Sequence, residues 1–221
     1  AENDDRLGAV VRRATLEGAP VFEVTKLELE ALTQGAVHQG VAMEIAAYDY
    51  ADALELLDRV SATGRKPLFV ALDQVTDPHN LGAVLRSAGA FGADGVIIPQ
   101  RRSADVNATV WKVSAGAAAR VPVAKETNLV RTLEAFKARG CFVVGLDGNG
   151  SVSVDNLNLA DQPLVLVTGA EGKGLSRLVR ETCDEIASIN IRAAVESLNA
   201  AVATGIALYE VDRVRRTTQG D

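Results

Sequence analysis

The stretch LVLVTGAEGKGL (residues 164–175) joins an apolar run to a glycine-rich turn. Its first four residues are apolar, with valine alternating with leucine, as in a strand that is buried on both faces. Three glycines, a glutamate and a lysine then follow within six positions. Because glycines directly after a strand allow a close approach to the main chain, this turn is a candidate ligand site.

The chain beyond Pro67 alternates between apolar strands and helical segments. Strands are expected at residues 68–75, 94–99, 141–147, 163–169 and 185–191, and helices at 80–93, 106–119, 129–139, 175–183 and 197–215. This alternation predicts an α/β fold, with a mostly parallel sheet covered by helices on both faces. Ligands of such sheets bind beyond the carboxyl ends of the strands, where the turns at 77–81, 169–174 and 189–199 are unusual.

Residues 1–45 differ in pattern and are interpreted as a small, partial N-terminal α/β domain. A helix is expected from Leu7 to Glu17, a strand at 20–24 (PVFEV), and a helix start at Thr25. Residues 46–66 are interpreted as a linker, although part of this segment has helical spacing, and turn-forming residues end it. The main domain is then 67–221.

Composition and charge narrow the class of protein. Hydrophobic residues make up 48% of the 221 residues, no apolar run is long enough to span a bilayer, and no signal peptide is recognised. Two cysteines and two histidines offer neither a disulfide framework nor a metal-ligand cluster, so a cytoplasmic protein without metal is expected. The net charge of −6 argues against coating nucleic acid by bulk electrostatics, but arginines at 101–102 and 213–216 leave a local basic patch open.

The glycine-rich turn does not match the common phosphate-binding loops. A Walker loop requires Gly, four residues and then Gly-Lys-Ser/Thr, whereas Gly169 is followed by Ala-Glu-Gly-Lys-Gly. The Gly-x-Gly-x-x-Gly fingerprint follows none of the strands, and LDGNGS (146–151) holds only half of it, which favours a plain turn there. A carboxylate at Glu171 would also repel a polyphosphate. The turn therefore suits a neutral or cationic ligand, or a buried polar partner for Glu171.

Three segments of the chain resemble, in order and spacing, the motifs of one enzyme family. They are DPHNLGAVLRSAGAFGADGVI (77–97), LVTGAEGKGLS (166–176) and SLNAAVATGIALYE (197–210). Together they resemble the SpoU-type RNA ribose 2'-O-methyltransferases of the SPOUT superfamily, over about residues 67–216. The resemblance is to the RlmB-like branch, which modifies guanosine in 23S ribosomal RNA. GAVHQGVAMEI (35–45) is similar to the end of that branch's small RNA-binding domain.

The resemblance implies a fold, a cofactor and partners. It implies a C-terminal trefoil knot, S-adenosylmethionine bound in a bent conformation within that knot, an RNA substrate, and a homodimer with the active site near the subunit boundary. Its cofactor contacts, made largely through main-chain groups, carry over to Thr168, Gly169, Ala170, Ile189 and Leu198. The glycine-rich turn would then hold the adenosyl part of a sulfonium cofactor rather than a phosphate.

Five further residues carry over as the catalytic set: Asn80, Arg86, Glu171, Ser197 and Asn199. The resemblance implies a catalytic and substrate-orienting pair, Asn80 and Arg86, with Arg86 as the proton acceptor. Because a guanidinium is effectively always protonated, we expect Arg86 instead to clamp the target's phosphate and to stabilise the developing alkoxide, while a water or phosphate takes the proton. The alternative is a surface arginine on an amphipathic helix.

The other three residues of this set have structural alternatives. Glu171 is expected to hold the Asn80–Arg86 pair in a polar network, the alternative being a loop carboxylate without a role. Ser197 and Asn199 are expected to cap the last helix, to contact the cofactor or catalytic loop, or both. His79 is interpreted as a turn residue, and Trp111 is expected to pack rather than to stack on a base.

Two positions depart from the family pattern in the turn before the last helix. Asn190 stands where the family usually has proline, and Ala193 where it usually has glycine. Losing a proline frees the main chain, and a Cβ at 193 disfavours a left-handed conformation, so a shifted loop and altered cofactor affinity are expected.

Several functions remain open at this point. The leading prediction is 2'-O-methylation of ribosomal RNA, and the runner-up is a transfer-RNA ribose target. A non-catalytic RNA-binding relative is a further alternative, favoured by the altered turn and the acidic net charge. A generic nucleotide-dependent enzyme would need a phosphate-binding loop, and the glycine spacing of this sequence matches neither of the common ones.

Overall fold

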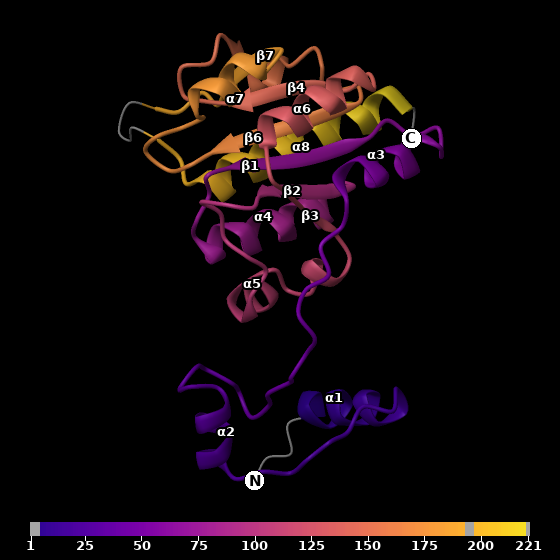
Figure 1. Ribbon diagram of the computed structural model, residues 1–221, viewed down its shortest axis with the longest axis vertical. Helices are drawn as coiled ribbons and strands as arrows, with labels where there is room; N and C mark the ends of the chain where they lie inside the picture. Colours follow the sequence, from indigo (N-terminus) through magenta and orange to yellow (C-terminus); the bar gives the residue numbers. More distant parts are fainter. Residues whose placement is uncertain (1–4, 193–196, 220–221) are drawn as a thin grey trace. The chain divides into compact units, whose positions relative to one another are not determined.

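The chain, in a computed structural model that describes residues 5–192 and 197–219, divides into two units (Figure 1). The smaller unit is Ala1–Ala47 and the larger one is Tyr48–Asp221. The larger unit contains the sheet, and every residue of the expected catalytic and cofactor-binding sets belongs to it.

The described part of the smaller unit contains two helices, α1 (Asp5–Leu16) and α2 (Lys26–Leu32). Thr25 begins α2 as expected. Its hydroxyl accepts from the main-chain N–H of Glu28, and the Glu28 carboxylate accepts from the Thr25 N–H at 2.7 Å. The strand expected at 20–24 is wrong, because these residues are exposed and have no regular structure. A strand needs a partner for its N–H and C=O groups, and the described residues of this unit offer none.

The larger unit is built on a sheet whose described residues form seven strands. They are β1 (Leu68–Asp73), β2 (Gly95–Pro99), β3 (Val123–Glu126), β4 (Phe142–Leu146), β5 (Val152–Ser153), β6 (Leu164–Gly169) and β7 (Glu185–Ser188). Their order is β3-β2-β1-β6-β4-β7-β5, and every adjacent pair is parallel. The expected parallel α/β fold is confirmed. The sequence pattern missed β3 and β5 because both are short and partly polar.

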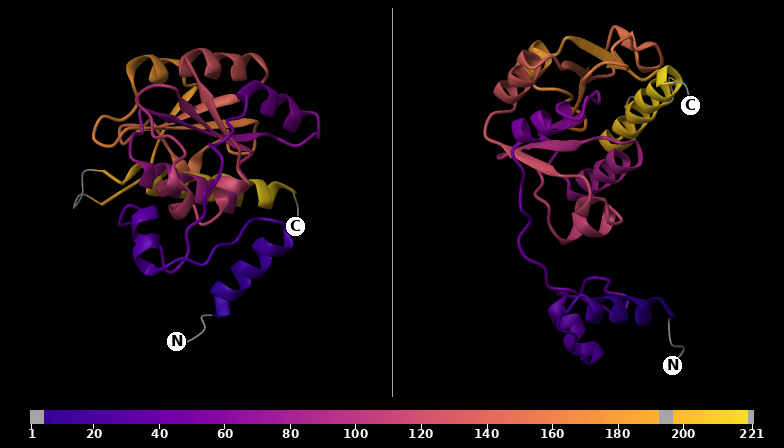
Figure 2. Two further views of the ribbon diagram at one scale, coloured as in Figure 1. Left: turned by 60° about the horizontal axis from the view of Figure 1, so that its bottom comes forward. Right: turned by 90° about the vertical axis from the view of Figure 1, so that its right-hand side faces the viewer.

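Helices cover both faces of this sheet (Figure 2). They are α3 (Ala53–Ser61), α4 (Pro78–Ala90), α5 (Ala108–Val113), α6 (Leu129–Ala138), α7 (Arg177–Thr182) and α8 (Ala200–Gln219), with 3-10 turns η1 (Ala117–Ala119) and η2 (Val154–Asn156). Side chains along β1 alternate between the faces. Leu68, Val70 and Leu72 pack with α4, α5 and α8, whereas Phe69 and Ala71 pack with α3, α6 and α7.

The segment expected to be a linker contributes a helix to the larger unit. Within it, Asp52 caps α3, and Leu56 and Leu57 are buried in the core beside Phe69. The structure therefore differs from the linker prediction for residues 48–66, because the apolar face of α3 is buried against the sheet. Trp111 packs as expected, with its ring 6.0 Å from that of Tyr48.

Parallel pairing brings the loops of the candidate site to one edge of the sheet. Asp73 is opposite Gly169 in the β1–β6 register, and Leu146 is opposite both Thr168 and Ala187. The chain therefore leaves β1, β4, β6 and β7 at the same carboxyl edge, as the sequence predicts. On one face, α8 packs against α4 and β6. The trefoil knot implied by the resemblance stays a prediction.

Arg215, near the end of α8, is hydrogen-bonded to the opposite, amino edge of the sheet. Its guanidinium donates to the carbonyl oxygens of Lys66 and Pro67 before β1, at 2.8 and 3.1 Å. It also donates to those of Ala160 and Gln162 before β6, at 3.1 and 2.6 Å. Burial lowers the pKa of Arg215, and the nearby carboxylates of Asp94 and Asp161 act in the opposite direction. Arg215 thus holds α8 to the ends of the two central strands.

We predict that Arg215→Lys lowers the free energy of unfolding by about 2–4 kcal/mol, because an ammonium cannot reach all four carbonyls and leaves some unpaired. Urea denaturation followed by circular dichroism measures this. The matched control is Arg216→Lys, at an exposed arginine that pairs with Asp212 at 3.0 Å, where a change below about 0.5 kcal/mol is expected. Equal stability of the two variants would contradict the role assigned to Arg215.

Candidate active site

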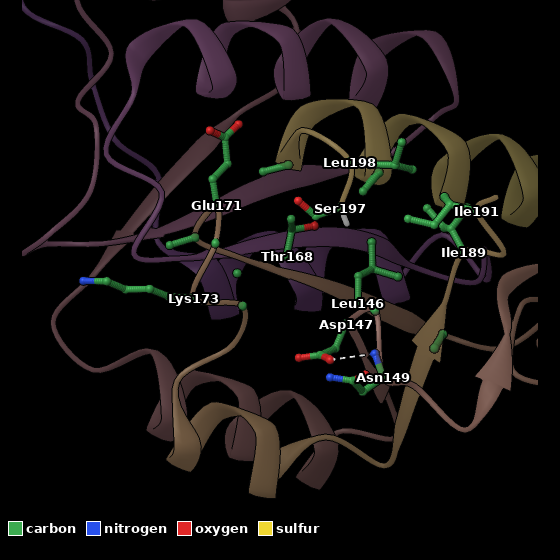
Figure 3. Close-up of a pocket in the computed structure, with 18 residues that line it drawn as sticks. Leu146, Asp147, Asn149, Thr168, Glu171, Lys173, Ile189, Ile191, Ser197 and Leu198 are labelled. Atoms are coloured by element: carbon green, nitrogen blue, oxygen red, sulfur yellow. Dashed lines mark hydrogen bonds between the residues drawn. The ribbon is translucent and has the colours of Figure 1, made fainter. Parts of the chain in front are cut away.

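A cavity of about 480 Å³ opens at the carboxyl edge of the sheet, beyond β4, β6 and β7 (Figure 3). Ile189, Ile191 and Leu198 lie together on one side of it, whereas Glu171 and Lys173 lie on the other. The five positions expected to contact a cofactor all line this cavity: Thr168, Gly169, Ala170, Ile189 and Leu198. The structure therefore brings together residues from the glycine-rich turn and from the segment that precedes α8.

The glycine-rich turn folds back on the end of β6. Ala170 and Gly174 form an antiparallel bridge, in which the Gly174 N–H donates to the Ala170 carbonyl at 2.9 Å. A Cβ at Gly169 would lie 2.2 Å from the main-chain carbon of Gly174, so only glycine fits there. Gly172 and Gly174 have φ of 71° and 65°, in the left-handed region. The glycines are thus required by the closed turn itself.

Three polar side chains that are distant in the sequence meet beside the cavity. Asn80, in the first turn of α4, donates through Nδ2 to Glu171 Oε1 at 3.0 Å. Asn199 Nδ2 donates to Asn80 Oδ1 at 2.8 Å and also to Glu171 Oε1. Asn80 is buried, with 6% of its surface exposed. The network expected for Glu171 is present around Asn80, and the Glu171 side chain extends toward α4 (Figure 3).

Asn199 also begins α8. Its Oδ1 accepts from the main-chain N–H groups of Ala201 and Val202, at 3.0 and 3.2 Å. The expected capping role of Asn199 is confirmed. Since the oxygen faces the helix, the Nδ2 group must face Asn80 and Glu171, so capping fixes the orientation of the amide. Ser197 lies outside α8 and lines the cavity.

Thr168 connects the cavity floor to α8. Its hydroxyl lies 2.7 Å from that of Thr204, and both residues are buried. The Thr204 hydroxyl donates to the carbonyl of Ala200 at 2.7 Å. Thr168 is therefore the donor to Thr204, and its proton is not available to a ligand. Thr168 lines the cavity while holding β6 to α8.

Arg86 lies outside this cavity, in a separate groove of about 530 Å³. The groove runs between α4 and α8, and Arg86 is exposed in it. Asn199 lines the same groove, whereas Glu171 and Ser197 line only the cavity. The Asn80–Glu171–Asn199 cluster thus stands between the two hollows. The structure does not place Arg86 in hydrogen-bonding contact with the cluster.

Sequence reasoning assigned no role to three polar residues of the cavity, namely Asp147, Asn149 and Lys173. Asp147 follows β4, and its Oδ2 lies 2.7 Å from Arg180 Nη1 on α7. Its Oδ1 accepts from the Asn149 N–H at 2.9 Å (Figure 3). The signal that could have found Asp147 is a carboxylate at the carboxyl end of a strand, next to a glycine. The sequence analysis instead interpreted this segment as a plain turn, because it holds only half of the phosphate-binding fingerprint.

Among residues 5–192 and 197–219, no group of three or more His, Cys, Asp or Glu side chains could hold a metal ion. Burial raises the pKa of Cys141 to about 11 and that of Cys183 to about 12, so neither thiol is a nucleophile at neutral pH. No helix in the described chain is both long and apolar enough to span a membrane. The departure at Ala193 lies outside the described residues.

The chain matches two described families. The SpoU rRNA Methylase family matches residues 67–209, and a domain described as RNA 2'-O ribose methyltransferase substrate binding matches residues 1–51. The chain is 51% identical over 217 residues to an uncharacterized tRNA/rRNA methyltransferase of Mycobacterium ulcerans, which covers 98% of this chain and 69% of that protein.

Solved structures that resemble the chain include two with bound AdoMet. One is the SpoU methyltransferase AviRb of Streptomyces viridochromogenes in complex with AdoMet, at 28% identity and a TM-score of 0.70, covering 89% of this chain and 80% of that one. The other is an AdoMet-bound rRNA methyltransferase of Sinorhizobium meliloti, at 26% identity and a TM-score of 0.73, covering 95% and 78%. The protein thus belongs to the SpoU rRNA methylase family of RNA methyltransferases.

The cavity fits the cofactor of this class, S-adenosylmethionine. Its volume of about 480 Å³ is in the usual range for small-molecule sites. Ile189, Ile191 and Leu198 offer an apolar surface for a flat base, and Gly169 and Ala170 at the end of β6 also line the cavity. The carboxylates of Asp147 and Glu171 suit the positive charge of a sulfonium.

We predict that Gly169→Ala destabilises the fold by about 3 kcal/mol or more, because the added methyl meets the main chain of Gly174, which cannot rotate away. The midpoint of thermal unfolding measures this. The matched control is Gly148→Ala, at another glycine that lines the cavity but has no atom within 4 Å of its would-be Cβ. A Gly169→Ala protein as stable as this control would refute the closed turn.

Proposed function

We propose that this protein transfers the methyl group of S-adenosylmethionine to the 2'-hydroxyl of a ribose in RNA. The observation that carries the proposal is the Asn80–Glu171–Asn199 cluster, which stands between the cavity and the groove that contains Arg86. A methyl donor in the cavity and a ribose in the groove would meet at this cluster. This placement supports a direct transfer, for which orientation of the two reactants is a large part of catalysis.

When bound, S-adenosylmethionine supplies an electrophilic methyl group, and the protein must orient the attacking hydroxyl toward it. Glu171 Oε1 accepts from the amides of both Asn80 and Asn199, which holds the Asn80 side chain in one orientation. The Asn80 oxygen accepts from Asn199 and keeps a second lone pair, which can accept the ribose O–H. The Glu171 side chain also lines the cavity that is proposed to hold the sulfonium.

Arg86 completes the site from the groove. Its exposed guanidinium offers five N–H donors in a planar arrangement, which suits a phosphate of the target nucleotide. The same positive charge would stabilise the ribose oxygen as it becomes an alkoxide. The proton then passes to a water molecule or to a phosphate oxygen, since a guanidinium does not accept it.

The substrate we propose is 23S ribosomal RNA, with a guanosine as the target. The support is the resemblance to the RlmB-like branch and the match of residues 1–51 to a substrate-binding domain. Transfer RNA is the runner-up, because the name of the mycobacterial relative includes both RNAs. Either substrate implies a cytoplasmic location.

We further propose a homodimer in which α4 and α8 of the two subunits face each other. The groove between these helices is lined by exposed apolar side chains, namely Val202 (51%), Ile206 (37%) and Tyr209 (46%). Arg86 lies on the same groove. A second copy over this surface would cover the apolar side chains and enclose the substrate side of the site.

We predict that Arg86→Ala lowers the rate of methyl transfer to RNA at least about 100-fold, because the alkoxide loses its cationic partner. Cofactor affinity should change less than about threefold, since Arg86 does not line the cavity. Transfer of labelled methyl groups to ribosomal and transfer RNA from cells lacking the gene gives the rate and identifies the substrate. The control is Arg131→Ala, at an exposed arginine on α6. Near-normal activity of Arg86→Ala would show that its assigned role is wrong.

We predict that Ile206→Asp converts a dimer to a monomer, because a carboxylate buried in an apolar interface has no partner. Sedimentation velocity of the native protein should give the mass of two chains, and that of the variant one. The matched control is Leu178→Asp, at an exposed leucine (54%) on α7, which should leave the dimer intact. A monomeric native protein, or a dimer that survives Ile206→Asp, rules this interface out.

A further inference from the structure

Asn190 lies between two residues that line the cavity, Ile189 and Ile191. Its own side chain is exposed and does not line the cavity. Instead, its Nδ2 donates to the hydroxyl oxygen of Ser153 at 2.9 Å. Ser153 is the last residue of β5, the edge strand that pairs with β7. A side-chain hydrogen bond therefore ties the cavity segment to the outermost strand.

The direction of this hydrogen bond is set by a third residue. The Ser153 hydroxyl donates its proton to the carboxylate of Asp155. The same oxygen can therefore only accept from position 190, which must supply a donor. An asparagine amide meets this requirement. An aspartate of the same shape would instead place a second carboxylate beside Asp155, without a proton to share.

The hydrogen bond between Asn190 and Ser153 lies just beyond the point where the pairing of β5 with β7 ends. The β5–β7 register runs through the pairs Val152–Ala187 and Ser153–Ser188. The Ser188 hydroxyl adds a hydrogen bond to the Gly150 carbonyl at 3.1 Å. Beyond Ser188, the next described residue of this segment whose side chain makes a hydrogen bond is Asn190. This hydrogen bond therefore attaches the chain to β5 at the residue between Ile189 and Ile191.

We propose that Asn190 is a positioning residue for cofactor binding, which acts through Ser153. Together they hold Ile189 and Ile191 in the wall against which the adenosyl group rests. This inference depends on the proposed function, because it takes the cavity to be the S-adenosylmethionine site. Without the Asn190–Ser153 hydrogen bond, the segment around Ile189 and Ile191 samples other conformations. The affinity for S-adenosylmethionine then falls in proportion to the fraction of molecules that keep the binding conformation.

The test is calorimetric titration of the full chain with S-adenosylmethionine, in the native protein and in variants. Asn190→Ala, Asn190→Asp and Ser153→Ala should each raise Kd about three- to tenfold, the effect of losing one hydrogen bond. Ser153→Thr keeps the hydroxyl and should keep native affinity. The double variant Asn190→Ala/Ser153→Ala should bind no more weakly than either single variant, since both remove the same bond.

Two further measurements separate positioning from general destabilisation. The unfolding temperature of the cofactor-free variants should stay within about 2 °C of the native value, because the bond is exposed and single. Asn158→Ala, at an exposed asparagine outside the cavity lining, should leave Kd unchanged. The inference is overturned if Asn190→Ala and Asn190→Asp bind S-adenosylmethionine with the same Kd as the native protein. It is also overturned if Ser153→Thr binds the cofactor weakly. Absence of binding by the native protein overturns the proposed function, and this inference with it.

Discussion

The contact between Gly169 and the main chain of Gly174 is the constraint on which the rest of the site depends. It lets the chain leave β6, reverse within five residues and form a bridge to its own start. Any Cβ at Gly169 would force the two backbones apart. The reversal places Gly169, Ala170 and Glu171 on the cavity lining and brings the Glu171 carboxylate to Asn80 of α4. The cavity lining and the Asn80–Glu171–Asn199 cluster therefore both depend on the close contact between Gly169 and Gly174.

Side-chain hydrogen bonds then connect the turn to the helices on one face of the sheet. Glu171 joins Asn80 of α4 to Asn199 at the start of α8, and Thr168 joins β6 to Thr204 of α8. The far end of α8 is held to the amino edge of the sheet by the guanidinium of Arg215. Because α8 is held at both ends, the groove and the cavity keep a constant separation, which a direct transfer between their occupants requires.

The sequence predicted the parts of the fold whose pattern is local. The strands that became β1, β2, β4, β6 and β7 are continuous apolar runs, and Thr25 and Asn199 are recognisable caps. Prediction was wrong or incomplete where burial depends on distant residues. PVFEV (20–24) has the composition of a strand but no partner strand among the described residues. Helix α3 lies in a segment predicted to be a linker, and β3 is half polar. The cavity positions followed from the motifs, whereas Asp147 and the tie from Asn190 to Ser153 did not.

By itself, the sequence determined that the chain forms a parallel α/β sheet. It also predicted a candidate ligand site at the carboxyl edge of that sheet and excluded the common phosphate-binding loops there. The glycine spacing and the alternation of strands and helices carry this information locally. Only the tertiary structure decided which side chains meet. Asn80 and Asn199 lie 119 positions apart and become hydrogen-bonded, whereas Arg86, only six positions from Asn80, lies exposed in the groove without a hydrogen bond to either. The reason is that long-range packing of α4 and α8 on one sheet face, rather than distance along the chain, sets these contacts.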